Sequence, residues 1–430
     1  MSEPTPGTQI GSAGRRFEPQ DVEVPKALPR SEAALPLSTV LVALIVGQIC
    51  LHSVMAGIRM AAPLWVLRQS HAEWAVGVLI GLFAVAPIAL ALQAGRLADR
   101  HGYHRPLYVA VGLTIAGGAS AVSATFFAAP VDFLLLCIGA TFVGAGANYG
   151  LIAIFRTAGR SAKGAIELKQ VFSWLGLAPA LANVAGPVLA GALIDFGGFR
   201  IAFGALMLLP LLALMTARRV PIEVPPPRSP EALAQSSWAL LRTPGLRRLL
   251  VVNWLLSASW DVHTFVVPIL GHERAFSASA IGLVLGAFAA AVALVRLAIP
   301  LVAHRLRESE VLVGAMLATG AVFAVYPLMV SPWAMGCCAA LLGLALGSVQ
   351  PMIMATLHQL TPHDRHGEAI ALRSMTINLS SAVMPLAFGV AGAALGAASL
   401  FWLMGALLVA GSLQARRIGA PASELDRPRC

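Results

Sequence analysis

The sequence predicts an all-α integral membrane protein with twelve transmembrane helices in two pseudo-symmetric six-helix bundles. Hydrophobic residues make up 58% of the 430 residues, charged residues make up 12%, and the mean hydropathy is +0.78. The apolar residues form continuous blocks of about 20, the length that a helix needs to cross roughly 30 Å of hydrocarbon. Backbone polar groups in lipid must hydrogen-bond internally, so these blocks form helices. Their continuity excludes a transmembrane barrel, whose strands alternate apolar and polar residues.

Each predicted span is an apolar block bounded by charged, proline-containing or glycine-containing turns. In chain order, the predicted spans are 37–58, 74–94, 106–127, 132–154, 170–194, 199–217, 247–270, 279–299, 310–330, 333–357, 374–395 and 398–415.

The longest polar interruption within the predicted bundle, 218–246, divides the spans into six and six. It is rich in proline and arginine, which cannot continue a buried helix, so we expect a cytoplasmic linker. The predicted bundles are therefore 37–217 and 247–416. The polar segment 1–36 lacks the apolar core of a cleavable signal peptide and is expected to be a disordered cytoplasmic tail. A second cytoplasmic tail is expected at 417–430.

The distribution of basic residues predicts the orientation of the chain. All but four of the 30 Lys and Arg residues fall at ends, loops or tails on one predicted side. The four exceptions are Arg59, Arg68, Arg200 and Arg274. An excess of basic residues marks the cytoplasmic side, so both termini are expected in the cytoplasm of a multi-pass protein of the bacterial inner membrane. The net charge of +10 is thereby explained as a topology signal, without a nucleic-acid partner.

An internal repeat supports the division into halves. When the second span is shifted by 205 residues, it lies over the eighth, and glycines, a phenylalanine and loop residues coincide. The matched pairs are Gly77 with Gly282, Gly81 with Gly286, Phe83 with Phe288, Ala98 with Ala303, and Arg100 with Arg305. Apolar helices share a small alphabet, so chance similarity is the alternative to duplication. Repeated halves around a central path are typical of transporters.

The charged run from Gly95 to Arg105 lies between two spans and is expected in a tight turn at the membrane face. Its pattern, Gly-x-Leu-Ala-Asp-Arg-x-Gly, resembles the loop between helices 2 and 3 of the major facilitator superfamily. The residues that match include Gly95, Asp99, Arg100 and Gly102, whereas Tyr103 and His104 replace the usual basic pair. The twelve spans, the linker and the repeat extend the resemblance over about 37–416.

The resemblance implies that these residues form an inner gate. Gly95 and Gly102 would allow close helix approach and a tight turn. Asp99 would meet the N-terminal end of the span at 374–395, which begins near Gly367-Glu368 and favours an anion. Arg100 and Arg105 would tie the loop to neighbouring helix ends. The alternative is that these charges serve only to fix topology.

A second resemblance lies in the span at 170–194. Gly186, Pro187 and Gly191 match a glycine-proline motif that exporters of the same superfamily often carry in helix 5. Small residues allow close packing in lipid, and proline permits a bend. The match favours export, although ordinary small-residue packing explains it equally well.

Polar residues deep in the spans are the candidate proton and substrate sites, because ionisable groups within a membrane are costly. Asp261 is the carboxylate placed deepest, near the middle of the span at 247–270, and is interpreted as a proton or cation site. His263 or His52 would assist it. A structural pairing of Asp261 with another helix is the alternative.

Further polar candidates lie in spans that the resemblance places around the central path. Arg59 follows His52 by seven residues and shares its helix face, so it would bind an anionic substrate, neutralise Asp261, or reach the outer surface. Asn148 and Gln350 would hydrogen-bond to substrate or to neighbouring helices.

No metal, cofactor or enzymatic role is expected. The clustered segment His363–His366 is expected to be a solvated loop, and no zinc, phosphate-loop or serine-hydrolase motif occurs. The sequence predicts a monomeric secondary transporter that moves a small organic solute by alternating access, coupled to protons, with export by antiport favoured. Uptake by proton symport is the alternative. A non-transporting membrane sensor and a membrane-embedded enzyme are more remote alternatives.

Overall fold

The computed structural model describes residues 39–71, 73–223, 236–276 and 278–418. The predicted tail 1–36, most of the tail 417–430 and residues 224–235 of the predicted linker lie outside this part. The described chain is helical. The long helices are α1 (Thr39–Arg68), α2 (Glu73–His101), α3 (His104–Ala124), α4 (Val131–Ser161), α5 (Ala165–Ala217), α7 (Pro244–Glu273), α8 (Ala278–Val302), α9 (Glu308–Val325), α10 (Pro332–Gly347), α11 (Val349–Leu360), α12 (His366–Leu395) and α13 (Ala397–Arg416). Short 3-10 turns cover Ser237–Arg242 (η1), Ala303–Arg305 (η2), Tyr326–Leu328 (η3) and His363–Arg365 (η4).

The helices confirm the predicted all-helical membrane fold. Within the described residues, ten helices are long and apolar enough to cross a membrane. The 53-residue helix α5 is interrupted by non-helical backbone at Gly197 and Gly198, where Gly198 has a φ of +80° that only glycine adopts readily. Thus α5 contains the two spans predicted at 170–194 and 199–217.

One predicted boundary was wrong in detail. The segment Gly95–His101 was expected in a turn, but it forms the last turns of α2, and only Gly102 and Tyr103 separate α2 from α3. A helix can extend beyond the hydrocarbon because its backbone bonds are internal. The span predicted at 333–357 is confirmed as one candidate span, Pro332–Leu360, in which Ser348 separates α10 from α11 near Pro351, which lacks a backbone donor.

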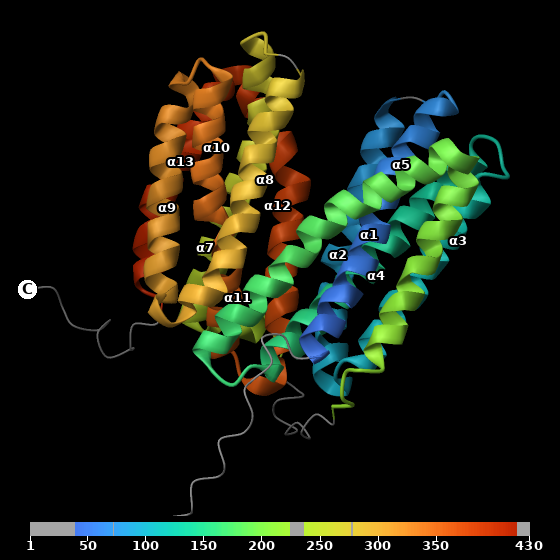
Figure 1. The fold of residues 1–430 in the computed structure, drawn as a ribbon, viewed down its shortest axis with the longest axis horizontal. Coiled ribbons are helices and arrows are strands. Elements are labelled where there is room, and N and C mark those ends of the chain that lie inside the picture. Colours follow the sequence, from blue (N-terminus) through green and yellow to red (C-terminus); the bar gives the residue numbers. More distant parts are fainter. Residues whose placement is uncertain (1–38, 72, 224–235, 277, 419–430) are drawn as a thin grey trace, which may run out of the picture. The chain divides into compact units, whose positions relative to one another are not determined.

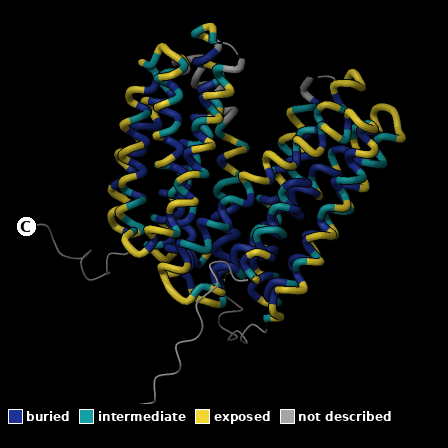
Figure 2. The backbone as a smooth tube through the Cα atoms, viewed as in Figure 1, coloured by how far each residue is buried: buried dark blue, intermediate teal, exposed yellow. Residues whose placement is uncertain are grey.

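The helices pack as two groups. In the first, α1 lies along α5, while α4 packs against α2 and α3; in the second, α8 packs on α10, and α13 packs on α7 and α9. Figure 1 shows the first group in blue to green and the second in yellow to red. Helices α2 and α5 of the first group contact α8, α11 and α12 of the second. Buried residues line the helix contacts, whereas many exposed residues on the outer faces are large and apolar (Figure 2).

Equivalent glycines set the helix packing in each group. Gly144 of α4 packs on the backbone carbonyl of Phe83 in α2, and Gly343 of α10 packs on the carbonyl of Phe288 in α8. A Cβ atom at either glycine would collide with that carbonyl. Phe83 and Phe288 are a matched pair of the sequence repeat, so the same close contact recurs in both groups.

We predict that Gly343→Ala lowers the stability of the folded protein by about 1–3 kcal/mol, because overpacking forces two backbones apart. The matched control is Gly336→Ala on the same helix, where a Cβ atom would meet nothing within 4 Å. Thermal unfolding in detergent, followed by tryptophan fluorescence, should show a lower melting temperature for the first variant only. Equal melting temperatures would contradict the packing argument.

Candidate functional site

A buried carboxylate joins the two groups of helices where α2 ends and α12 begins. The Oδ1 atom of Asp99 accepts a hydrogen bond of 2.8 Å from the backbone amide of Gly367, and Oδ2 accepts one of 2.9 Å from that of Glu368. These amides belong to the first turn of α12 and have no partner within the helix. The positive end of the helix dipole also favours the negative charge. We call this part of the molecule the Asp99 end.

Arg156 of α4 completes the coordination of Asp99. Its side chain is fully buried, and its Nε donates to Oδ1 of Asp99 at 2.8 Å. Its Nη1 donates to Oε2 of Glu223 at 2.7 Å, and Arg160 contacts Oε1 of the same carboxylate at 2.8 Å. An ion-pair network of alternating charge therefore runs from α12 through α2 and α4 to Glu223, which follows α5.

A second ion pair lies beside this network. Arg365 in η4 contacts Glu368 at 2.7 Å and donates to the carbonyl of Ser236 at 2.9 Å. The segment His363–His366 is therefore not the solvated loop that was expected, because Arg365 and His366 are buried. The ring of His366 lies 3.1 Å from the backbone carbonyls of His358 and Thr361. Burial lowers the pKa of His366 to about 4, which keeps this ring neutral near pH 7.

Two glycines allow the close approach at the Asp99 end. A Cβ atom at Gly95 would lie 2.5 Å from the carbonyl oxygen of Gly367 and 2.9 Å from Cβ of Ala371. Gly102 has a φ of +69°, and a Cβ atom there would lie 3.1 Å from Cβ of Glu223. Larger residues at these positions would separate α2 from α12 or push Glu223 away.

The arginine that contacts Asp99 is not one of the arginines of the motif. Arg100 and Arg105 are exposed, and Arg156 is the arginine that contacts Asp99. Sequence reasoning missed Arg156, Arg160 and Glu223. Their only local signal is the spacing of four between the two arginines, which places both on one helix face at the end of a predicted span.

The glycine-proline motif lies where α5 crosses α1. A Cβ atom at Gly186 would collide with the carbonyl of Ser53, and one at Gly57 would lie 3.0 Å from the carbonyl oxygen of Gly186. A Cβ atom at Gly191 would lie 3.9 Å from Cε of Met60, an ordinary contact distance. Pro187 is half-buried in a helix whose non-helical backbone occurs only at Gly197 and Gly198 within the described residues. The motif therefore packs α5 closely against α1.

The candidate proton site lies on α7. Asp261 is half-buried, and the hydroxyl of Ser380 in α12 donates to its Oδ2 over 3.4 Å. His263 is fully buried on another face of α7, 3.4 Å from the hydroxyl of Tyr326 and stacked on Phe288. The structure therefore does not bring His263 to Asp261.

The other polar candidates lie on α1, α4 and α11. His52 is half-buried on α1 and hydrogen-bonds to Asn183 of α5, while Arg59 is exposed further along α1. Asn148 accepts a 2.5 Å hydrogen bond from Ser374 of α12, which links the two groups of helices. Gln350 accepts a 3.0 Å hydrogen bond from Arg296 of α8.

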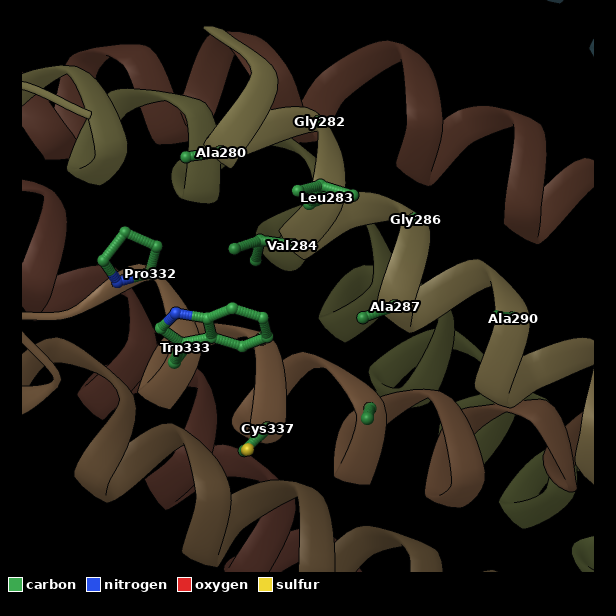
Figure 3. A pocket seen from close by; sticks show the side chains of 12 residues that line it. Ala280, Gly282, Leu283, Val284, Gly286, Ala287, Ala290, Pro332, Trp333 and Cys337 are labelled. Carbon is green, nitrogen blue, oxygen red and sulfur yellow. The ribbon is translucent and has the colours of Figure 1, made fainter. Parts of the chain in front are cut away.

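An apolar groove of about 710 Å³ lies between α8 and α10 (Figure 3). Its walls include Leu283 and Val284 of α8, and Trp333 and Cys337 of α10. The groove offers almost no hydrogen-bonding groups and contains none of the polar candidates, so it is not part of the candidate site.

These features define a helical membrane protein whose two halves are joined by a buried ion-pair network. The sequence model described as Major Facilitator Superfamily matches residues 44–258 and 249–429. The chain therefore belongs to the Major Facilitator Superfamily. It is a multi-pass secondary transporter of a small molecule, and not an enzyme.

Similar proteins and structures agree with this assignment. The chain is 27% identical over 317 residues to "Enterobactin exporter EntS" of Salmonella choleraesuis (strain SC-B67), covering 71% of this chain and 74% of that protein. A bacterial homologue of the iron transporter ferroportin, solved in an outward-facing state, superposes with a TM-score of 0.72 at 18% identity, covering 88% of this chain and 98% of that one. The human organic anion transporter MFSD10 (TETRAN) gives a TM-score of 0.67 at 18% identity, with 88% and 99% coverage.

We predict that Asp99→Asn destabilises the protein by about 3–5 kcal/mol, because it leaves the buried Arg156 without one of its charge partners. The control is Glu310→Gln, which removes a largely exposed pair with Arg307 and should change stability by less than about 1 kcal/mol. Thermal unfolding in detergent measures both. If Asp99→Asn and the control melt at the same temperature, the ion-pair network does not stabilise the contact at the Asp99 end.

Proposed function

We propose that the chain exports a small organic compound across the bacterial inner membrane in exchange for protons. The observation that carries the proton coupling is Asp261, a half-buried carboxylate in the middle of α7. Among the residues that the structure describes, its side chain has one long hydrogen bond, to Ser380. A charged carboxylate at this depth is costly, so the gain or loss of a proton at Asp261 changes the free energy of the surrounding state strongly. The curated relatives, which are named as exporters, support the direction.

The proposed mechanism is alternating access between two halves, 37–217 and 247–416, with 218–246 as the linker. The Asp99 end would face the cytoplasm, as would both termini, in keeping with the basic residues on that side. The contacts of α2 and α5 with α8, α11 and α12 would close the inner entrance in the present state. The outward-facing state of the ferroportin homologue that shares the fold supports this view.

Protons would drive the cycle by favouring one state. An ionised Asp261 favours the arrangement in which polar groups or water reach it, whereas a neutral Asp261 tolerates closure. Substrate and proton can shift the balance only by binding the two states with different affinity. In antiport, Asp261 would take up a proton outside and release it inside while the solute moves out. In symport, the proton and the solute would move in the same direction, so the direction of proton movement relative to the solute separates the two.

We predict that Asp261→Asn abolishes proton-coupled transport and leaves folded protein in the membrane. Proteoliposomes containing a pH-sensitive dye would be given a pH gradient and screened with organic anions, cations and sugars. The active compound should move protons with the normal protein and with the control Asp195→Asn, which changes an exposed carboxylate of α5. Full coupled transport by Asp261→Asn would refute the assignment, and proton movement in the same direction as the solute would establish symport.

A further inference from the structure

Two buried arginines in the second half differ from the other buried cations. Within the described residues, five Lys and Arg side chains are buried. Three of them contact a carboxylate: Arg156 contacts Asp99, Lys169 contacts Glu308, and Arg365 contacts Glu368. Arg296 and Arg373 have no carboxylate partner among the residues that the structure describes. Burying an unpaired charge is costly, so these two sites need an explanation.

Neutral groups hold the two arginines in place. Arg296 of α8 donates to the carbonyl oxygens of Gly176 and Gly347 and, at 3.0 Å, to Oε1 of Gln350. Arg373 of α12 donates through Nε to Oδ1 of Asn253 in α7 at 3.0 Å. None of these partners carries a formal negative charge. The positions of the two guanidinium groups are therefore fixed while their charges stay uncompensated.

The two arginines repel each other, and an unused hydrogen-bond donor lies beside Arg373. Arg373 lies close enough to Arg296 for their positive charges to repel each other. Asn253 is 1% exposed, and its Nδ2 has no hydrogen-bond partner in the described part of the chain. A buried amide donor without a partner is rare and commonly marks a missing ligand. A buried guanidinium without a carboxylate partner and the spare amide donor beside it would both be satisfied by an anion.

We propose that Arg296 and Arg373, with Asn253, bind an oxyanion. Guanidinium groups match carboxylate, sulfate and phosphate oxygens, because their donors form a planar fork. The anion would be either the carboxylate of the transported organic compound or a free inorganic oxyanion. If the anion is the transported compound, the site identifies the substrate class of the proposed transporter, and this conclusion rests on the proposed function. Anion binding itself does not depend on the proposed function.

The position of the site links anion binding to the transport cycle. Arg296 donates to Gly176 of α5, and the hydroxyl of Ser173 donates to the carbonyl of Arg296 at 2.5 Å. Both contacts join the first half of the protein to the second. When the halves separate at the Asp99 end, Arg296 loses these partners. A bound anion would then stabilise its charge more strongly. The site would therefore bind most tightly when open to the inner side, where an exporter collects its substrate.

Equilibrium binding to the purified full chain in detergent tests the site. Sodium benzoate would be compared with neutral benzamide, and sodium sulfate with sodium chloride at equal ionic strength. We expect benzoate or sulfate to raise the melting temperature in a saturable way, with benzamide and chloride without effect. The oxyanion that acts identifies the source: benzoate alone indicates an organic carboxylate, and sulfate with equal or greater effect indicates an inorganic oxyanion.

The decisive variant is Asn253→Asp, which places a carboxylate beside Arg373 without changing the shape of the side chain. It should raise the melting temperature in the absence of anions and abolish the response to them. Arg373→Gln should weaken the apparent affinity on the order of tenfold or more, the cost of losing a charged hydrogen-bond partner. The control Arg305→Gln changes an exposed arginine and should respond normally.

Two results would overturn the anion site: no oxyanion-specific stabilisation of the normal protein, or an unchanged response in Asn253→Asp. A lower melting temperature for Asn253→Asp would also contradict it. Asp261→Asn should keep the anion response, since binding requires no proton gradient. Failure of proton coupling and failure of the anion site are therefore observed separately.

Discussion

The structure depends on one buried carboxylate that is shared between two helical groups. Asp99 accepts two backbone hydrogen bonds from the start of α12 and forms an ion pair with Arg156. In a low-dielectric environment such contacts are strong only when each partner is satisfied, and here the helix amides, Arg156 and Glu223 satisfy one another. Gly95 makes the arrangement possible, because a side chain there would collide with the backbone of α12. A contact built in this way can close one end firmly and still separate as a unit.

The other charged groups differ in how far their neighbours compensate them. The ion pairs at the Asp99 end neutralise Arg156 and Arg365, whereas Arg296 and Arg373 are left with neutral partners. Asp261 lies in the membrane-spanning part of α7 with little support from its neighbours. The molecule therefore combines a tightly compensated contact with weakly compensated groups within the spans. This combination suits a protein in which the contact sets the resting state and the uncompensated groups respond to solute and protons.

The sequence predicted the fold well, because hydropathy and helix length are local properties. The apolar blocks located the helices that are long and apolar enough to cross a membrane. The linker expected at 218–246 stays a prediction. The error arose where the structure continues past the membrane, because α2 runs on to His101.

The candidate site was less predictable. The role of Asp99 followed from its resemblance to a family motif, but Arg156 and Glu223 lie 57 and 124 positions further along the chain and have no periodic relation to it. Arg373 lies directly before the span predicted at 374–395. Its burial beside Asn253 depends on how α7 and α12 pack, which no local pattern reveals.

The most direct test of the account is to hold the Asp99 end closed and measure transport. Lys169 and Glu308 lie on opposite halves, 3.4 Å apart between Nζ and Oε1. A reducible bifunctional thiol reagent would join Lys169→Cys to Glu308→Cys in proteoliposomes, with each single variant as a control for the native cysteines. The account predicts that cross-linking stops transport and that reduction restores it. Undiminished transport by the cross-linked protein would show that this end need not open.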